Sequence, residues 1–296
     1  MYYRRKIILS LLALKTGPVS KIDLQKLLFL FTKYPNSTKI YDFVPYKYGC
    51  FSFQANADLN TMIKYNHVST DDKKWTLEET DTDYISQLKD NDKKTLTALM
   101  KHHGSKSTND LINFTYKNFP YWATKSTIAH KHLSESELTK VEAQKTSSSV
   151  KALYTIGYEG ISLEAYLNRL IEHDIRLLLD VRKNAKSMKY GFSKSQLFNA
   201  CNGIGIEYRH MPEVGIESDK RTELNDQSDY DTLFEDYKDT TLSTTISYQE
   251  QIGTLVKDYK RVALTCFEEN ICQCHRKPLA ESVVSLSKTK LKLNHI

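Results

Sequence analysis

In the first part of the chain, apolar positions recur every three to four residues, which predicts amphipathic helices. Gly17 and Pro18 interrupt the first pattern, and Ser20 can cap the helix that follows. The stretch "HVSTDDKKWTLEE" predicts a polar hairpin. The predicted helices cover residues 4–15, 20–33, 52–65, 84–102 and 107–118. Short helices across a tight turn, followed by a third helix and a hairpin, are typical of a winged helix, here with a helical extension.

The second half of the chain has a different pattern, in which short apolar runs alternate with helical patterns. The runs that predict strands are residues 152–157, 175–181, 205–210 and 261–267. The helical patterns cover residues 162–173, 193–203, 229–238 and 245–258. Strands that alternate with helices predict an α/β domain with a parallel sheet covered on both faces.

A polar segment separates these two patterns. It has no apolar face and ends in four small residues before Lys151. We therefore predict a mostly helical, winged-helix-like domain over 1–133, a linker over 134–150 and an α/β domain over 151–296.

Charge and cysteine content narrow the functional classes. Residues 1–149 carry 22 Lys and Arg against 15 Asp and Glu, whereas residues 150–296 carry 20 against 21. A basic module joined to a near-neutral one is typical of proteins whose first part meets nucleic acid, although lysines also form ordinary solvated surfaces. The five cysteines are odd in number and unevenly placed, which favours reduced thiols. With no predicted membrane span, and an amphipathic first helix favoured over a secretory signal, we expect a cytoplasmic protein that does not engage membranes.

Chemically useful side chains follow each predicted strand of the second half. The carboxyl ends of parallel strands share one edge, where ligands usually bind. Asp180 and Glu268 can supply a general base or nucleophile and a general acid, and His210 can orient a carboxylate or carry a proton. Arg182, His275 and Arg276 can hold a phosphate, and Tyr158 and Tyr208 can stack on a base. The alternative is an Asp180–Arg182 or Glu268–Arg276 ion pair that only fixes loops.

The stretch "CFEENICQCHRKPLA" allows several interpretations. Cys266, Cys272, Cys274 and His275 are metal-ligating types, but Cys274 and His275 are adjacent and the stretch lacks a C-x-x-C pair, so we predict neither a metal nor a cofactor. Cys266 suits a small core residue and Cys272 an exposed loop thiol. Cys274, at the predicted start of a helix and near Arg276, is a candidate nucleophile because both features favour a thiolate.

Both halves resemble known families. "LQKLLFL" and "PYKYG" resemble the Panacea family, which implies an antitoxin-associated domain over about the first 80 residues. "TIGYEG", "DVR", "GIEYRHMPEVG", "CFEENICQCHR" and the terminal "HI" resemble the DUF488 family, a domain of unknown function. The chain departs from that family where Asn184 or Ala185 replaces a proline and where "IESDKR" replaces Gly-Gly-Arg after Gly215. The residues that carry this resemblance are Gly157, Asp180, Arg182, Phe192, Tyr208, His210, Pro212, Gly215, Cys266, Glu268, Cys274, His275 and Arg276.

Genes of the DUF488 family occur together with bacterial genes for DNA modification and defence, which implies a nucleic-acid or nucleotide substrate. We therefore hypothesise a hydrolase or glycosylase that cleaves a glycosidic or phosphoester bond in DNA, including modified or phage DNA. The N-terminal domain would then bind the polymer or a protein partner. The alternative is a regulatory, antitoxin-like protein that senses a nucleotide without turnover. Thiol-based transfer through Cys274 is a third hypothesis.

Overall fold

The computed structural model describes residues 1–296 except 218–219, 221–223 and 288–289. The chain forms two compact units, Met1–Lys145 and Thr146–Ile296, and each is described by itself. Within the described residues, every helix is too short or too polar to cross a lipid bilayer.

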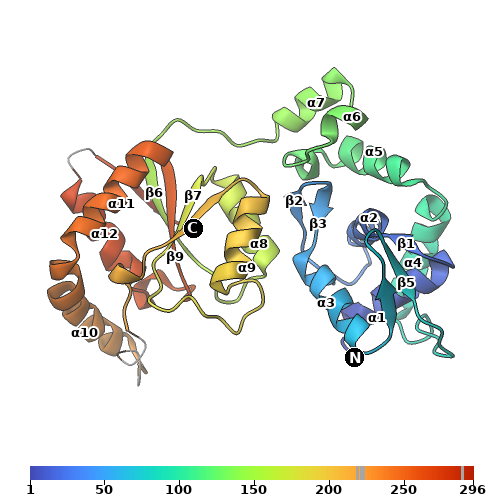
Figure 1. The fold of residues 1–296 in the computed structure, drawn as a ribbon, viewed down its shortest axis with the longest axis horizontal. Helices are drawn as coiled ribbons and strands as arrows, with labels where there is room; N and C mark the ends of the chain where they lie inside the picture. Colours follow the sequence, from blue (N-terminus) through green and yellow to red (C-terminus); the bar gives the residue numbers. More distant parts are fainter. Residues whose placement is uncertain (218–219, 221–223, 288–289) are drawn as a thin grey trace. The chain divides into compact units, whose positions relative to one another are not determined.

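The first unit is a mixed helical region with two small antiparallel sheets (Figure 1). Its α-helices are α1 (Tyr3–Lys15), α2 (Lys21–Phe31), α3 (Phe53–Lys64), α4 (Asp90–His103), α5 (Thr108–Asn118), α6 (Ala129–His132) and α7 (Glu135–Glu142), with a 3₁₀ helix η1 (Pro120–Ala123). The first sheet has the order β1 (Val19–Ser20), β5 (Lys74–Leu77), β4 (Val68–Thr70), and the second pairs β2 (Val44–Tyr46) with β3 (Gly49–Phe51). The predicted helices and hairpin are therefore present, whereas the β2–β3 pair lies in a segment that the sequence left unassigned.

Local sequence explains where helices of this unit begin. Ser20 and Ser52 accept hydrogen bonds from the backbone N–H groups of Asp23 and Ala55, so each caps the helix that follows. Ser134 and Glu137 form a reciprocal capping box that starts α7 inside the segment predicted as a linker. Val141 of that helix is buried, so the first half of the predicted linker is a packed helix of the first unit.

The second unit is an α/β domain, which confirms the predicted fold class. Five parallel strands lie in the order β10 (Lys292–His295), β6 (Ala152–Gly157), β9 (Arg261–Cys266), β7 (Leu177–Asp180), β8 (Glu207–His210). Figure 1 shows α8 (Leu163–Glu172) and α9 (Lys194–Gly203) on one face of this sheet, and α11 (Ile246–Tyr259) and α12 (Arg276–Leu286) on the other. The described part of this unit also contains α10 (Gln227–Tyr237), the 3₁₀ helices η2 (Pro212–Val214) and η5 (Ile271–Gln273), and the π-helix η4 (Lys238–Leu242).

The three central strands β6, β9 and β7 are buried on both faces, as the continuous apolar runs predict. Leu153, Leu177 and Leu264 pack in a fully buried cluster with Ile252 of α11 and Leu279 of α12. On the other face, the buried Tyr166 hydroxyl of α8 donates a hydrogen bond to Thr265 Oγ1 at 2.7 Å. Only β10, which pairs with β6 at the sheet edge, had no predicted counterpart.

Candidate functional site

The parallel sheet brings the carboxyl ends of four strands to one edge. Gly157, at the end of β6, pairs with Cys266, at the end of β9. Asp180, at the end of β7, pairs with Thr265 of β9 and with His210 of β8. Side chains from segments far apart in the sequence therefore meet at this edge, which is the geometry that the strand pattern predicts.

Asp180 and Arg182 form a buried ion pair at this edge. The side chain of Asp180 is fully buried and that of Arg182 is 6% exposed. Arg182 donates through Nε to Asp180 Oδ1 at 2.8 Å and through Nη2 to Oδ2 at 2.5 Å. Asp180 also accepts hydrogen bonds from the Arg182 backbone N–H and from the Tyr208 hydroxyl at 2.7 Å. These four bonds occupy the carboxylate, which favours the loop-fixing alternative over a free base.

Two tyrosines complete this network. The Tyr158 hydroxyl accepts a hydrogen bond from Arg182 Nη1 at 2.6 Å, and the Tyr158 ring stacks on Phe192 with centroids 4.3 Å apart. Burial raises the pKa of Tyr158, and burial followed by the charge of Asp180 raises that of Tyr208. Both hydroxyls are therefore neutral, and the Tyr208 hydroxyl is engaged in the ion-pair network.

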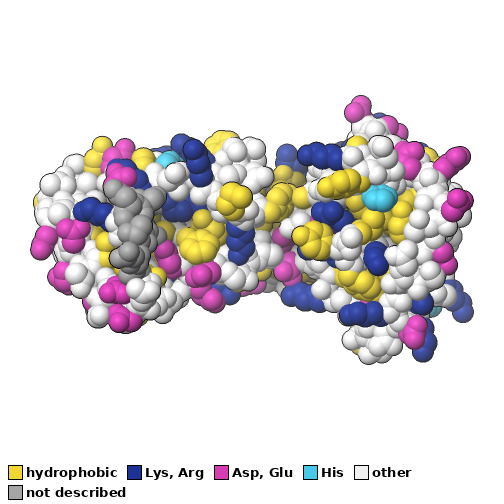
Figure 2. Space-filling model, turned by 90° about the horizontal axis from the view of Figure 1, so that it is seen from below, with side chains coloured by type: hydrophobic (Ala, Val, Ile, Leu, Met, Phe, Trp, Pro, Cys, Tyr) yellow, Lys and Arg dark blue, Asp and Glu magenta, His cyan; other side chains and the backbone are white. Residues whose placement is uncertain are grey.

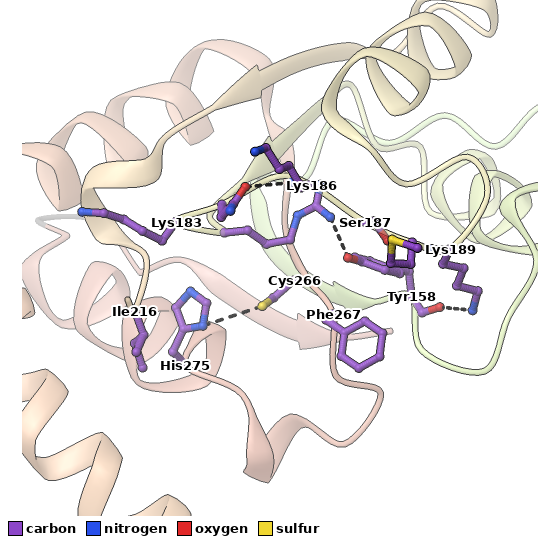
Figure 3. Close-up of a pocket in the computed structure, with 12 residues that line it drawn as sticks. Tyr158, Lys183, Lys186, Ser187, Lys189, Ile216, Cys266, Phe267 and His275 are labelled. Carbon is purple, nitrogen blue, oxygen red and sulfur yellow. Dashed lines mark hydrogen bonds between the residues drawn. The ribbon is translucent and has the colours of Figure 1, made fainter. Parts of the chain in front are cut away.

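A cavity of about 460 Å³ opens beside this network (Figure 3). The segment after β7 contributes three lysines, Lys183, Lys186 and Lys189, while Tyr158 and Phe267 contribute aromatic surface. Lys189 Nζ donates to the Tyr158 carbonyl at 2.6 Å, and Lys183 pairs with Glu217. These lysines and Phe267 were not among the predicted site residues, although the regular three-residue spacing of lysines directly after a strand was a signal for the lysines.

A second cavity, of about 930 Å³, adjoins the first along the segment 183–187. His210 and Tyr208 line it together with Phe198 of α9. The Nε2 atom of His210 lies 2.8 Å from the Arg182 carbonyl oxygen. His210 is thus tied to the segment that separates the two cavities and lies away from Cys266.

A cluster of sulfur, imidazole and carboxylate groups lies at the floor of the first cavity. Cys266, Cys274 and His275 are buried, and their ligand atoms all lie within 4.8 Å of one another. The Cys266 Sγ lies 3.7 Å from His275 Nδ1 and donates to Glu268 Oε2 at 3.2 Å. In Figure 3 the His275 ring and the Cys266 sulfur face each other below the lysine-bearing segment. Within the described residues, Cys266, Cys274 and His275 are the group that could hold a metal ion.

The expected thiolate of Cys274 is not favoured in this environment. Burial raises the pKa of Cys274 well above its usual value, and Cys266 and Glu268 raise it further, whereas Arg276 lowers it to a smaller extent. The helix α12 begins at Arg276, so Cys274 also lies outside its first turn. Desolvation therefore outweighs the two features that predicted activation, and Cys274 is a thiol.

Arg276 fixes the loop that carries Glu268. It is buried and donates through Nη1 to the Glu268 carbonyl at 2.5 Å and through Nη2 to the Glu269 carbonyl at 3.1 Å. Gly157 lies against the same loop, where an added Cβ would overlap the Glu268 carbonyl oxygen. The Arg276 guanidinium therefore holds backbone, and it does not line the cavity where a phosphate would bind.

The comparisons with known proteins add one match. Residues 162–283 match the family model of the domain of unknown function DUF488. The DUF488 match thus covers β7, β8 and β9 together with Cys266, Glu268, Cys274 and His275. No curated protein matches the chain. No solved structure matches it either. The comparisons do not support the Panacea resemblance, which stays a prediction. The segment "IESDKR" (216–221), where the sequence departs from the Gly-Gly-Arg of the DUF488 family, falls partly outside the described residues.

Proposed function

We propose that the chain is an enzyme directed at nucleic acid, whose second unit cleaves a glycosidic or phosphoester bond in DNA. The observation that carries this proposal is the first cavity, where lysines and aromatic rings lie beside the Cys266–Glu268 pair at the carboxyl edge of a parallel sheet. Ligand sites of open α/β sheets lie at this edge.

The cavity lining suits a phosphate joined to a flat base. Lys183, Lys186 and Lys189 supply positive charge, and the described residues that line this cavity include no Asp or Glu, although Lys183 pairs with Glu217 nearby. Phe267 is 42% exposed and offers a ring face, while Tyr158 is already stacked on Phe192. Phe267 is therefore the better platform for a base. A lysine and an exposed aromatic ring together favour a nucleotide over a simple anion.

The second cavity supports a polymeric substrate over a mononucleotide. The two cavities share Lys183 and Lys186, so a strand held by its phosphates at this segment could extend from one cavity into the other. Lys194 and His210 line the second cavity and would meet the neighbouring nucleotide. This arrangement keeps His210 in a substrate-binding or proton-carrying role.

Glu268 is the residue proposed for acid–base chemistry. It lies next to the cavity floor, and the Cys266 Sγ hydrogen bond orients its carboxylate. Positioned acid–base catalysis typically contributes 10²–10⁴-fold. Asp180 would act through Arg182, by holding the edge rigid, because its own oxygens are engaged.

The first unit is proposed to bind DNA through a winged-helix arrangement. Helix α3 is followed by the β4–β5 hairpin, and β1 pairs with β5, as in winged-helix domains. Lys73 and Lys74 lie at the turn and start of β5. On the face drawn in Figure 2, Lys and Arg side chains of this unit stand around a group of hydrophobic side chains, and acidic side chains lie mostly towards its rim.

Nucleotide sensing without turnover is the second candidate. The observation that favours it is the engagement of both Asp180 oxygens in four hydrogen bonds, which removes one of the two predicted catalytic carboxylates. The same cavity would then bind a nucleotide and report its presence to a partner of the first unit.

The test uses the full chain with labelled duplex, single-stranded and base-modified DNA. We expect a cleaved product with wild type and binding weakened by Lys186→Gln, whereas Lys257→Gln, outside both cavities, should bind as wild type does. The loss of one phosphate contact should reduce the salt slope of binding by about 1. Tight binding without product would support the sensor. Neither binding nor product with any DNA would contradict the enzyme, and calorimetry that shows no binding of any free nucleotide in a panel would contradict the sensor.

A further inference from the structure

We infer that Cys266, Cys274 and His275 form a binding site for a zinc-type divalent ion, with a fourth coordination position directed to the first cavity. All three residues are buried, and their ligand atoms lie within 4.8 Å of one another. Two come from the segment before α12 and one from the end of β9, so the site joins the strand to the following helix.

The distances fit tetrahedral coordination after small adjustments. Zn–S bonds of about 2.3 Å and Zn–N bonds of about 2.0 Å place sulfur and nitrogen ligands about 3.6 Å apart at a tetrahedral angle, and two sulfurs about 3.8 Å apart. The observed Cys266 Sγ to His275 Nδ1 distance is 3.7 Å, and the largest separation in the cluster is within 4.8 Å. A shift of about 1 Å in one side chain would complete the geometry.

The backbone explains how adjacent residues can both reach one ion. Cys274 is extended, with φ −132° and ψ 133°, whereas His275 is helical, with φ −60° and ψ −17°. The change of backbone direction between them turns both side chains towards Cys266. The sequence argument against a metal considered only the spacing of the ligands and could not include this turn.

The surroundings of His275 match those of a metal-bound imidazole. Its Nε2 lies 3.1 Å from the Val181 carbonyl oxygen, an acceptor, so the proton resides on Nε2 and Nδ1 is the basic nitrogen. A backbone carbonyl on the far nitrogen is the usual orienting partner of a ligating histidine. The Glu268 carboxylate, 3.2 Å from Cys266 Sγ, lies beside the cluster without being part of it.

The donor set selects the class of ion and leaves one position open. Thiolate and imidazole ligands suit Zn²⁺, whereas Mg²⁺ and Ca²⁺ prefer oxygen. Cys266 and His275 both line the first cavity, so the remaining position can take water or a substrate atom. The buried thiols must lose their protons to bind the ion, so affinity should rise with pH and binding should release protons.

Ion binding does not depend on the proposed function; only the use of the ion does. If the chain cleaves DNA, water on the ion would be acidified to a pKa of about 7, and Glu268 is placed to accept its proton. Metal binding without cleavage would leave this inference standing, and cleavage by metal-free protein would leave the proposed function standing.

The experiment titrates Co²⁺ into chelator-treated, full-length protein and then displaces it with Zn²⁺. We expect one equivalent to give the intense visible bands of tetrahedral Co²⁺ with a thiolate charge-transfer band, and Zn²⁺ to abolish them. Cys274→Ser and His275→Gln should weaken binding by at least about 100-fold. Cys272→Ser and Cys201→Ser, outside the cluster, should bind as wild type does.

Folding of each variant is followed by circular dichroism. If a cluster variant does not fold, the wild-type titration alone decides, because a protein without the site gives no stoichiometric tetrahedral spectrum. Absence of that spectrum in wild type overturns the inference. A spectrum that survives in folded Cys274→Ser and His275→Gln, or that disappears in Cys272→Ser, also overturns it.

Discussion

Replacing Asp180 by asparagine removes the charge that compensates a buried guanidinium. Arg182 is 6% exposed and makes two side-chain hydrogen bonds to Asp180, so the variant would leave a buried cation without its counterion. Breaking a buried pair by removing one partner typically costs about 3–5 kcal/mol. For a unit of this size, each kcal/mol lowers Tm by about 2–4 °C, so we expect a fall of about 6–20 °C.

The assay is thermal unfolding followed by circular dichroism, with Asp174→Asn as the matched control. Asp174 and Arg176 have the same spacing in sequence, but the Arg176 side chain is 37% exposed. Asp174 is 18% exposed and also lies 4.0 Å from Arg261 Nε, but Arg176 stays partly solvated without it, so its loss should cost about 1 kcal/mol, well below the Asp180 change. The double variant Asp180→Asn/Arg182→Met should recover part of the lost stability, since the uncompensated charge is gone.

The result that would refute this reasoning is an Asp180→Asn protein as stable as the Asp174→Asn control. Together with a loss of cleavage, that result would return Asp180 to the role of a catalytic carboxylate. A less stable variant whose remaining folded fraction cleaves DNA normally would support the ion-pair role.

Three further predictions concern other parts of the chain. Gly157→Ala should displace the Glu268 loop, lower the free energy of unfolding by about 1–3 kcal/mol and reduce cleavage. In the control Gly253→Ala an added Cβ meets nothing within 4 Å, so denaturant unfolding should show neutral or raised stability. Equal effects of the two substitutions would contradict the close contact at Gly157. Brief alkylation at neutral pH, followed by mass spectrometry, should label the exposed Cys272 before the buried Cys266 and Cys274. Cys272→Ser should abolish this early label. Early labelling of Cys274 would instead favour thiol chemistry. Burial alone would raise the pKa of Asp58, but hydrogen bonds from Arg4, Arg5 and Tyr41 lower it overall. Its stabilising contribution should therefore be present above the ordinary aspartate pKa of about 3.9 and be lost as pH falls further towards the lowered value. Acid unfolding of the first unit should show this loss in wild type and a smaller pH dependence in Asp58→Asn.

Much of the fold was predictable because local pattern and packing agree in most elements. The sequence predicts strands over the mostly apolar stretches 152–157 and 261–267, and the observed strands β6 and β9 (Arg261–Cys266) are buried along their whole length. The edge strand β10 was missed because Lys292–His295 is short and polar apart from Leu293, and its pairing with β6 depends on distant residues. Helix α7 was missed because its single buried residue, Val141, gives no apolar periodicity.

The sequence predicted which types of residue gather at the site, but not most of the contacts that these residues make. Strand ends share an edge in any open parallel sheet, which explains why Asp180 lies beside His210 on one side and Thr265 on the other. The burial of Cys274 and the engagement of Arg276 with loop carbonyls follow from tertiary packing, which spacing does not encode. The lysines after β7 were passed over because lysine runs are common on solvated surfaces.

The central claim is that the edge beside Cys266 performs acid–base chemistry on nucleic acid through Glu268. The most direct measurement is the single-turnover rate of cleavage of labelled DNA by wild type, Glu268→Gln and Glu269→Gln, each at saturating protein. The account predicts a rate lowered by about 100-fold or more in Glu268→Gln and an unchanged rate in the neighbouring control. Equal rates in all three proteins would contradict it.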